Sequence, residues 1–146
     1  MPEVRRAIHA SPDAVWAVLA DPTTYPEWLV GAQAIRDVEP GFPAPGSDFH
    51  HSVGPTDEVT LADRTTALEA EAPHRLRLKV RARPFFEGIV TFRLLPTKAG
   101  TELVLHEEPV GPLRLLAPLL SPLILGRNKQ SLERLAHLVE TGSPEP

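Results

Sequence analysis

The sequence contains no cysteine, which excludes disulfide bonds, thiolate nucleophiles and thiolate metal sites. It also has no long apolar run. The most apolar stretch, Leu113–Leu125, is interrupted by Arg114, Pro118 and Pro122. A membrane-spanning helix needs about 20 apolar residues, more than this stretch supplies. The opening residues MPEVRRAIHA lack the apolar core of a signal peptide. The sequence therefore predicts a cytoplasmic protein without a membrane span.

Aromatic residues make up only 5% of the chain, and neither sign of charge dominates, because 15 Lys and Arg stand against 19 Asp and Glu. The net charge of −4 does not predict a nucleic-acid partner. Cations from Arg75 to Arg83 share one face of a predicted strand, but Glu69 and Glu71 precede them across a short turn. Cross-strand pairing on a solvated face explains this stripe, and no aromatic side chain interleaves there to stack bases.

The hydrophobic fraction of 42% and the length of 146 residues predict a single folded domain. We expect this domain to cover residues 1–142 and the tail 143–146 to be frayed. No internal repeat or long linker divides the chain. The sequence predicts no cofactor and no metal, because no spacing of ligands typical of a metal site occurs.

Proline is abundant, with 17 residues, and three of them follow a side chain that can cap a helix. Ser11-Pro12, Asp21-Pro22 and Ser121-Pro122 each place a capping oxygen before a proline, which suits the first turn of a helix. These pairs predict helices over 12–20 and 22–29 and a last helix over 122–141, with Gly142 after its end. The apolar stripe of the last helix comprises Leu125, Leu132, Leu135, Ala136 and Val139.

The segment between the second and the last helix predicts strands and turns. The clearest alternation runs from His74 to Arg83, where Leu76, Leu78 and Val80 share one face. A period of two over this length is typical of a half-buried strand. The same argument predicts strands over 3–9, 34–39, 47–53, 59–71, 74–83, 86–95 and 101–108.

Three stretches of sequence resemble a known superfamily. The segment ASPDAVWAVLADPTTYPEW resembles the opening segment of the START-like (SRPBCC) superfamily, which includes Bet v 1-type, polyketide cyclase/dehydrase and lipid-transfer proteins. The stretches HHSVG, DRTTALEAEAPHRLRL and GTELVLHEEPVGP are similar to bacterial members of its polyketide cyclase-like branch.

This resemblance implies the α+β helix-grip fold. In that fold a curved antiparallel sheet of about six to seven strands wraps around a long C-terminal helix, and an apolar cavity lies between them. The superfamily has no universal catalytic residue, so the resemblance transfers no catalytic set. The fold alone therefore does not choose between a binding protein and an enzyme.

His50 and His51 are the most chemically suggestive pair. Neighbouring strand residues point to opposite faces, so the two imidazoles cannot chelate one ion together. With Phe49 and Val53 inward, His51 faces the predicted cavity and His50 faces solvent. His51 is then a hydrogen-bonded interior histidine, a ligand contact, or a general acid/base. It is the single catalytic candidate.

Two carboxylates are candidates as well. Extending the alternation of strand 101–108 places Glu107 inward, either in an ion pair with a nearby arginine or as a polar anchor for a ligand. Asp63 lies in the middle of a strand, where a charge is unusual unless it is paired. It forms a structural salt bridge, or it serves as a ligand contact or base.

The two tryptophans differ in their expected positions. Trp16 lies at helical spacing from Leu19 and is expected in the core. Trp28 follows the short helix pair, which borders the cavity in the helix-grip fold, so we expect it at the cavity wall or rim, either in packing or in ligand contact.

The leucine-rich stretch Leu113–Leu125 has three possible interpretations: a lid over the cavity, a membrane-surface contact or a dimer patch. A packed lid is the simplest of these. A homodimer is therefore left open.

The sequence as a whole predicts that the cavity binds a small, largely apolar molecule: polyketide-like, aromatic or lipid. A cyclase/dehydratase-type enzyme acting on a polyketide-like substrate and a protein-interaction module without a ligand are the alternatives. The predicted ligand contacts are Trp28, Phe49, His51, Asp63, Leu78, Val90, Phe92, Glu107 and Leu132.

Overall fold

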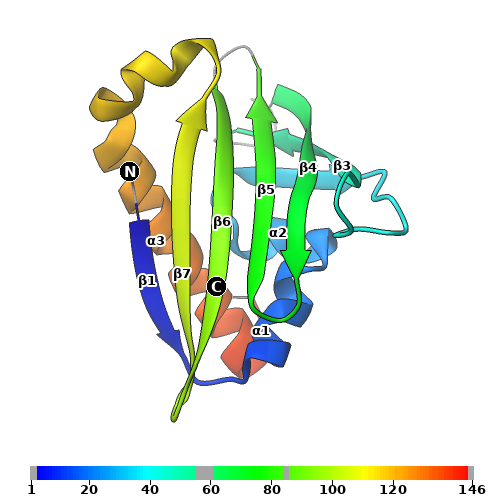
Figure 1. Ribbon diagram of the computed structural model, residues 1–146, viewed down its shortest axis with the longest axis vertical. Coiled ribbons are helices and arrows are strands. Elements are labelled where there is room, and N and C mark those ends of the chain that lie inside the picture. Colours follow the sequence, from blue (N-terminus) through cyan, green and yellow to red (C-terminus); the bar gives the residue numbers. More distant parts are fainter. Residues whose placement is uncertain (1–2, 55–60, 84–85, 145–146) are drawn as a thin grey trace.

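The computed structural model describes residues 3–54, 61–83 and 86–144. Its centre is one seven-stranded antiparallel sheet with the strand order β1-β7-β6-β5-β4-β3-β2. The helices gather on one side of this sheet, and α3 crosses behind it diagonally (Figure 1). The elements are β1 (Glu3–Ile8), α1 (Pro12–Leu19), η1 (Pro22–Thr24), α2 (Tyr25–Trp28), β2 (Ala32–Arg36), β3 (Asp48–Val53), β4 (Leu61–Glu71), β5 (Arg75–Ala82), β6 (Phe86–Thr97), β7 (Gly100–Val110), η2 (Pro112–Leu116) and α3 (Ala117–Thr141).

The hydrophobic core lies between the sheet and the helices. Apolar side chains from α1, α2 and α3 pack against the inward residues of the strands. This arrangement is the helix-grip fold that the resemblance implied, and it confirms the predicted α+β class. The buried side chains of largest volume include Trp28, Tyr25, Phe49, Leu76, Leu94, Leu103, Leu105, Leu132 and Leu135.

The two predicted helix starts near the N-terminus are confirmed. Ser11 Oγ accepts a hydrogen bond from the backbone N–H of Ala14, and Asp21 Oδ1 accepts one from the N–H of Thr23. Each cap satisfies a backbone donor that has no partner within the helix. The second predicted helix divides into the short 3-10 turn η1 and the single turn α2.

The predicted start of the last helix is wrong. The helix begins at Ala117, and Pro122 lies inside it. Instead of capping, Ser121 Oγ donates to the carbonyl of Ala117 at 2.9 Å. Pro118 lies in the first turn, where a proline costs no hydrogen bond. The missing N–H of Pro122 therefore affects only the second turn.

The predicted end of α3 is confirmed. Gly142 has φ 77, and its N–H donates to the carbonyl of Leu138. A left-handed residue at this position favours glycine. Of the predicted stripe, Leu132, Leu135 and Ala136 are buried, whereas Leu125 and Val139 are only partly buried. The buried face continues instead through Ile124, Asn128, Ser131 and Leu138.

The leucine-rich stretch does not form the packed lid that was its simplest predicted interpretation. Leu115, Leu119 and Leu123 are 82%, 78% and 73% exposed. Because the helix begins earlier than predicted, these residues lie on the outer face of η2 and α3, away from the sheet.

All seven predicted strands are present, and the largest changes are in the bounds of β2, β6 and β7. The predicted strand 34–39 is shifted to Ala32–Arg36 because Asp37 adopts a positive φ of 52, which ends the extended backbone. β6 and β7 extend beyond their predicted ends to Thr97 and Val110. The predicted start of β4 at Val59 lies outside the described residues. On the outer face, Glu69 pairs with Arg75 and Arg77, as expected for a solvated stripe.

Candidate functional site

The inward face of the sheet is not covered evenly. One cross-strand row, Leu105, Phe92 and Leu76, is fully buried. In contrast, Val80, Ala82 and Phe86 near the other end of β5 and β6 are only partly buried. At this second end β3 and β5 end, and β4 and β6 begin. The inward apolar residues near the start of β6 are therefore less buried than those of the central row.

His51 lies near this end, on β3. Its side chain is buried at 2% exposure, and it faces inward like Phe49, whose ring meets it edge-on at a centroid distance of 6.1 Å. Within the described part of the chain, neither Nδ1 nor Nε2 has a hydrogen-bond partner. Buried polar side-chain atoms nearly always have one. Among the described residues, this imidazole is therefore a buried side chain on the inward face whose polar atoms have no partner.

Burial lowers the pKa of His51 below its usual value of 6.5, because the charged form loses its solvation. The backbone of Arg64 and the charge of Asp63 oppose this shift without outweighing it. No described group meets the distance and angle of a hydrogen bond to either ring nitrogen. The imidazole is thus neutral at pH 7. It has one N–H to donate and one nitrogen to accept.

Asp63 lies directly across from His51 on β4, but it is engaged elsewhere. Its side chain is 5% exposed and pairs with Arg83 through Nη2–Oδ1 at 2.7 Å and Nε–Oδ2 at 3.0 Å. The backbone N–H groups of Arg64 and Arg83 also donate to it, each at 2.9 Å. This geometry is that of a structural salt bridge, which was one of the roles predicted for Asp63.

Burial alone would raise the pKa of Asp63. The hydrogen bonds from the side chain and backbone of Arg83 and from the backbone of Arg64 outweigh this effect and hold the pKa well below its usual range. A carboxylate this acidic is a poor general base near neutral pH. Asp63 is therefore better suited to hold the ends of β4 and β5 together.

Glu107 points inward from β7 and is 2% exposed. Its carboxylate accepts hydrogen bonds from Nη2 of Arg127 at 2.9 and 3.0 Å, and from Nδ2 of Asn128 at 3.1 Å. Both donors lie on α3, so the contact ties the helix to the sheet. This geometry matches the predicted ion pair of Glu107 with a nearby arginine.

Sequence reasoning missed Arg127 and Asn128. The predicted apolar stripe of the last helix included neither residue. The signal for Asn128 was available, because it lies four residues after Ile124 and four before Leu132 on the same face of α3. A polar residue there needs a partner across the interface, and Glu107 was the predicted inward carboxylate.

Trp28 is not at a rim. Its side chain is fully buried, and its ring packs edge-on against Tyr25 and Phe92 at centroid distances of 5.1 and 6.1 Å. The indole N–H donates to Oγ1 of Thr24 at 3.1 Å. This local partner satisfies the polar end of the ring, so the whole side chain can enter the core. Trp16, expected in the core, is the one that is only partly buried.

The remaining predicted ligand contacts form part of the packed interior. Phe49, Leu78, Phe92 and Leu132 belong to one hydrophobic cluster, and Val90 packs against it while partly exposed. Val90 lies between Leu78 and Glu107 in adjacent strands. The structure thus brings most of the predicted contacts onto one face.

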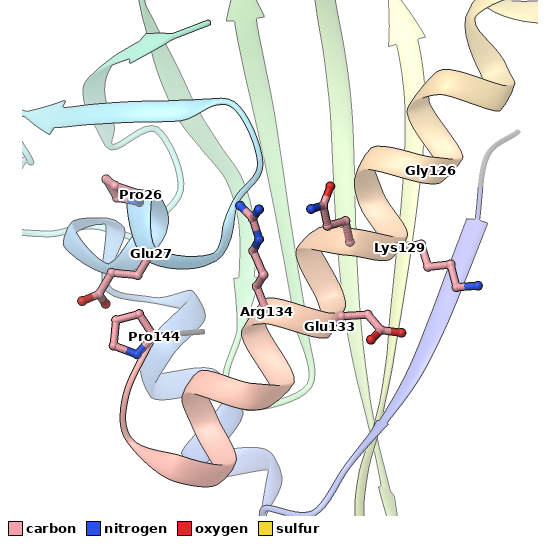
Figure 2. A pocket seen from close by; sticks show the side chains of 8 residues that line it. Pro26, Glu27, Gly126, Lys129, Glu133, Arg134 and Pro144 are labelled. Carbon is pink, nitrogen blue, oxygen red and sulfur yellow. The ribbon is translucent and has the colours of Figure 1, made fainter. Parts of the chain in front are cut away.

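A groove of about 710 Å³ lies on the outer side of α3, and none of the predicted ligand contacts lines it. Figure 2 shows Lys129, Glu133 and Arg134 projecting from α3, with Pro26 and Glu27 of α2 nearby. Its charges are of both signs, and none of its residues was a predicted contact. Among residues 3–54, 61–83 and 86–144, no three His, Asp or Glu side chains gather as metal ligands. No helix in the described ranges is long and apolar enough to cross a membrane.

Comparison with known proteins gives one family. The family model described as "Polyketide cyclase / dehydrase and lipid transport" matches residues 2–140. No curated protein matches the chain.

Solved structures share the fold. Protein CV1439 from Chromobacterium violaceum superimposes with a TM-score of 0.74 at 22% identity, over 94% of this chain and 96% of that chain. Protein MLL2253 from Mesorhizobium loti gives 0.70 at 25% identity, over 94% of each chain. The di-domain ARO/CYC StfQ from the steffimycin biosynthetic pathway gives 0.75 at 14% identity, over 96% of this chain and 50% of that chain.

Proposed function

Because the chain belongs to the polyketide cyclase/dehydrase and lipid transport family, we propose that it binds a small, largely apolar molecule against the inward face of the sheet. The molecule carries at least one hydrogen-bonding oxygen or nitrogen, and this group meets the imidazole of His51. The ligand is polyketide-like, aromatic or lipid in character.

The unsatisfied imidazole of His51 carries this proposal. A buried polar group without a hydrogen bond costs about 1–3 kcal/mol, and this ring has two such nitrogens at 2% exposure. A ligand carbonyl or hydroxyl would recover part of this cost, because a neutral imidazole can both donate and accept. His51 therefore favours a ligand with a polar group at one end.

The surroundings of His51 favour an apolar body for the same ligand. Val80, Ala82, Phe86 and Val90 present partly exposed apolar surface on the inward face, and the buried side chains of the core cluster lie beneath. Covering such surface is favourable in proportion to the apolar area removed from water. On this proposal, Val90 and Phe49 contact the apolar part, and the Glu107–Arg127 pair borders it.

The proposal is tested by ligand capture followed by titration. Native mass spectrometry of freshly purified protein identifies a co-purified small molecule. Calorimetric titration with hydroxylated aromatic compounds and fatty acids then measures affinity. His51→Phe should weaken binding about tenfold, the value of one lost hydrogen bond of about 1.4 kcal/mol. His51→Gln, which keeps a donor and an acceptor, should weaken it less.

The matched control is His50→Gln. His50 neighbours His51 on β3 but is exposed on the opposite face, so the change should leave affinity unaltered. Equal losses in the His50 and His51 variants would contradict a specific contact. If no compound co-purifies and none of the panel binds, the binding proposal fails and an interaction module takes its place.

A second candidate function, acid/base catalysis on a polyketide-like substrate, is supported by the same histidine. Burial lowers the pKa of His51 and keeps the ring neutral at pH 7, so one nitrogen is free to accept a proton. The similarity in fold to the ARO/CYC StfQ is compatible with this reaction class. For an enzyme of this kind, His51→Gln should lower the rate about 10²–10⁴-fold and largely keep the substrate affinity. An unchanged turnover number would remove His51 from the mechanism.

A further inference from the structure

Four leucines form an exposed ridge at the start of the last helix. Leu115, Leu119 and Leu123 are 82%, 78% and 73% exposed, and Leu116 beside them is 46% exposed. Together they are called the leucine ridge below. In Figure 1 this part of η2 and α3 lies at the upper edge of the molecule, beside the end of β7. Large apolar patches of this kind are rare on the surface of a monomer.

The helix beneath the ridge is apolar on its opposite side as well. Ile124 is 5% exposed and faces the interior, and Leu120 and Leu125 are partly buried. A helix that is apolar all round is usually buried on all sides or lies in a lipid environment. In this chain one side of the helix is covered by the protein and the other is not.

The charged residues within this stretch of sequence are cations. Between Pro109 and Leu132 the sequence has the cations Arg114, Arg127 and Lys129 and no carboxylate, although the whole chain has a net charge of −4. Arg127 is engaged with Glu107, whereas Arg114 and Lys129 are exposed. The carboxylate of Glu87 lies beside Gly111, before the leucines begin. Arg114, next to Leu115 in the sequence, is therefore the cation of the ridge, and its Nη1 donates to the carbonyl of Gly111 at 3.3 Å. Lys129 lies farther along α3, in the groove of mixed charge with Glu133.

We propose that the leucine ridge docks on an anionic lipid surface. Leucines on one face of a helix enter the boundary between headgroups and acyl chains, and nearby cations are attracted to anionic headgroups. The helix lies on the surface and does not span it, consistent with the absence of a spanning helix among the described residues.

A second copy of the chain fits the ridge less well. Standard protein interfaces use about 20–30 residues a side, and the ridge supplies four leucines. Pairing two identical ridges would also place Arg114 of both copies at one apolar interface, whereas an anionic surface attracts this cation. The docking does not depend on whether the inward face holds a ligand.

Vesicle flotation with the full chain tests the proposal. The vesicles are phosphatidylcholine alone, or phosphatidylcholine with about a third phosphatidylglycerol, a composition that supplies the anionic charge. The chain should float with the anionic vesicles, and much less with the neutral ones. High salt should weaken binding, because it screens the attraction of the cations.

Three variants assign the binding to the ridge. Leu119→Gln with Leu123→Gln should lower the fraction bound at least about tenfold. Arg114→Gln should lower it about fivefold, the effect of one cation near an anionic surface. The matched control is Leu95→Gln on β6, an equally apolar residue that is 38% exposed, which should leave binding unchanged. Because all these side chains are exposed, circular dichroism should show unaltered folding.

Two results would overturn the proposal. One is absence of binding to anionic vesicles, or binding that the leucine double variant and Leu95→Gln reduce equally. The other is a dimer, measured by light scattering, that the leucine double variant dissociates while vesicle binding is absent. That second result would assign the ridge to a second copy. Neither result bears on ligand binding at His51, which the titration measures separately.

Discussion

Replacing Arg127 with methionine tests the contact that joins α3 to the sheet. The change removes the hydrogen bonds of 2.9 and 3.0 Å that Nη2 donates to Glu107. The carboxylate, 2% exposed, is left with the amide of Asn128 at 3.1 Å. Methionine keeps the apolar part of the arginine side chain, so little packing is lost. The experiment therefore measures an uncompensated buried charge.

The expected loss follows from the burial of the two partners. Removing one partner of a fully buried ion pair costs about 3–5 kcal/mol. The side chain of Arg127 is 38% exposed, so solvent screens part of the attraction. We therefore expect the free energy of unfolding to fall by about 2–3 kcal/mol, a large fraction of the about 5–15 kcal/mol of a typical domain.

Replacing the whole polar trio should restore most of this loss. In the triple variant Glu107→Leu, Arg127→Met and Asn128→Leu, no charge or amide is left without a partner. Asn128 must be included because its amide, 3% exposed, would otherwise lose its acceptor. Apolar replacement of a buried ion pair is often neutral or stabilising, so the triple variant should lie within about 1 kcal/mol of the wild type.

Urea unfolding followed by circular dichroism gives the free energies, with the slope m as the check that unfolding remains two-state. The control is Lys129→Met, the same kind of change at an exposed neighbour. A loss below about 0.5 kcal/mol for Arg127→Met, typical of a surface position, would refute the reasoning. A triple variant as unstable as Arg127→Met would refute it as well.

Two further predictions concern stability. Because burial lowers the pKa of His51 from 6.5, the unfolded chain takes up a proton that the folded chain resists, and stability should fall as pH drops below about 6.5. The loss should stop below the folded pKa, and the difference between wild type and His51→Gln in urea titrations isolates it. A difference that does not vary with pH would contradict this. Leu132→Ala and Leu135→Ala should each cost about 2–5 kcal/mol in the same assay, whereas exposed Leu123→Ala should change stability by less than about 0.5 kcal/mol. Small losses at both buried positions would contradict the core assignment of α3.

Local patterns in the sequence were sufficient to predict the faces of the strands. Alternation alone placed His51 and Glu107 inward and the cations of β5 outward, because successive strand residues point to opposite sides. The caps Ser11 and Asp21 and the glycine after α3 were predicted for the same reason: each acts on backbone groups only a few residues away.

Other features depended on packing between distant segments. The sequence could not show that α3 begins before Pro122, since a proline in an early turn is tolerated when the rest of the helix is anchored elsewhere. Trp28 was expected at the cavity wall or rim, because its full burial depends on Thr24, Tyr25 and Phe92 meeting around it.

The sequence by itself thus determined the order of the strands and helices and which side of a strand faces inward, but not every bound. The tertiary structure alone decided what each inward group meets: Arg127 and Asn128 for Glu107, Arg83 for Asp63, and no described partner for His51. The physical reason is range. Periodicity and caps reflect interactions within a few residues, whereas the partner of a buried polar group is set by how a helix and a sheet far apart in sequence pack together.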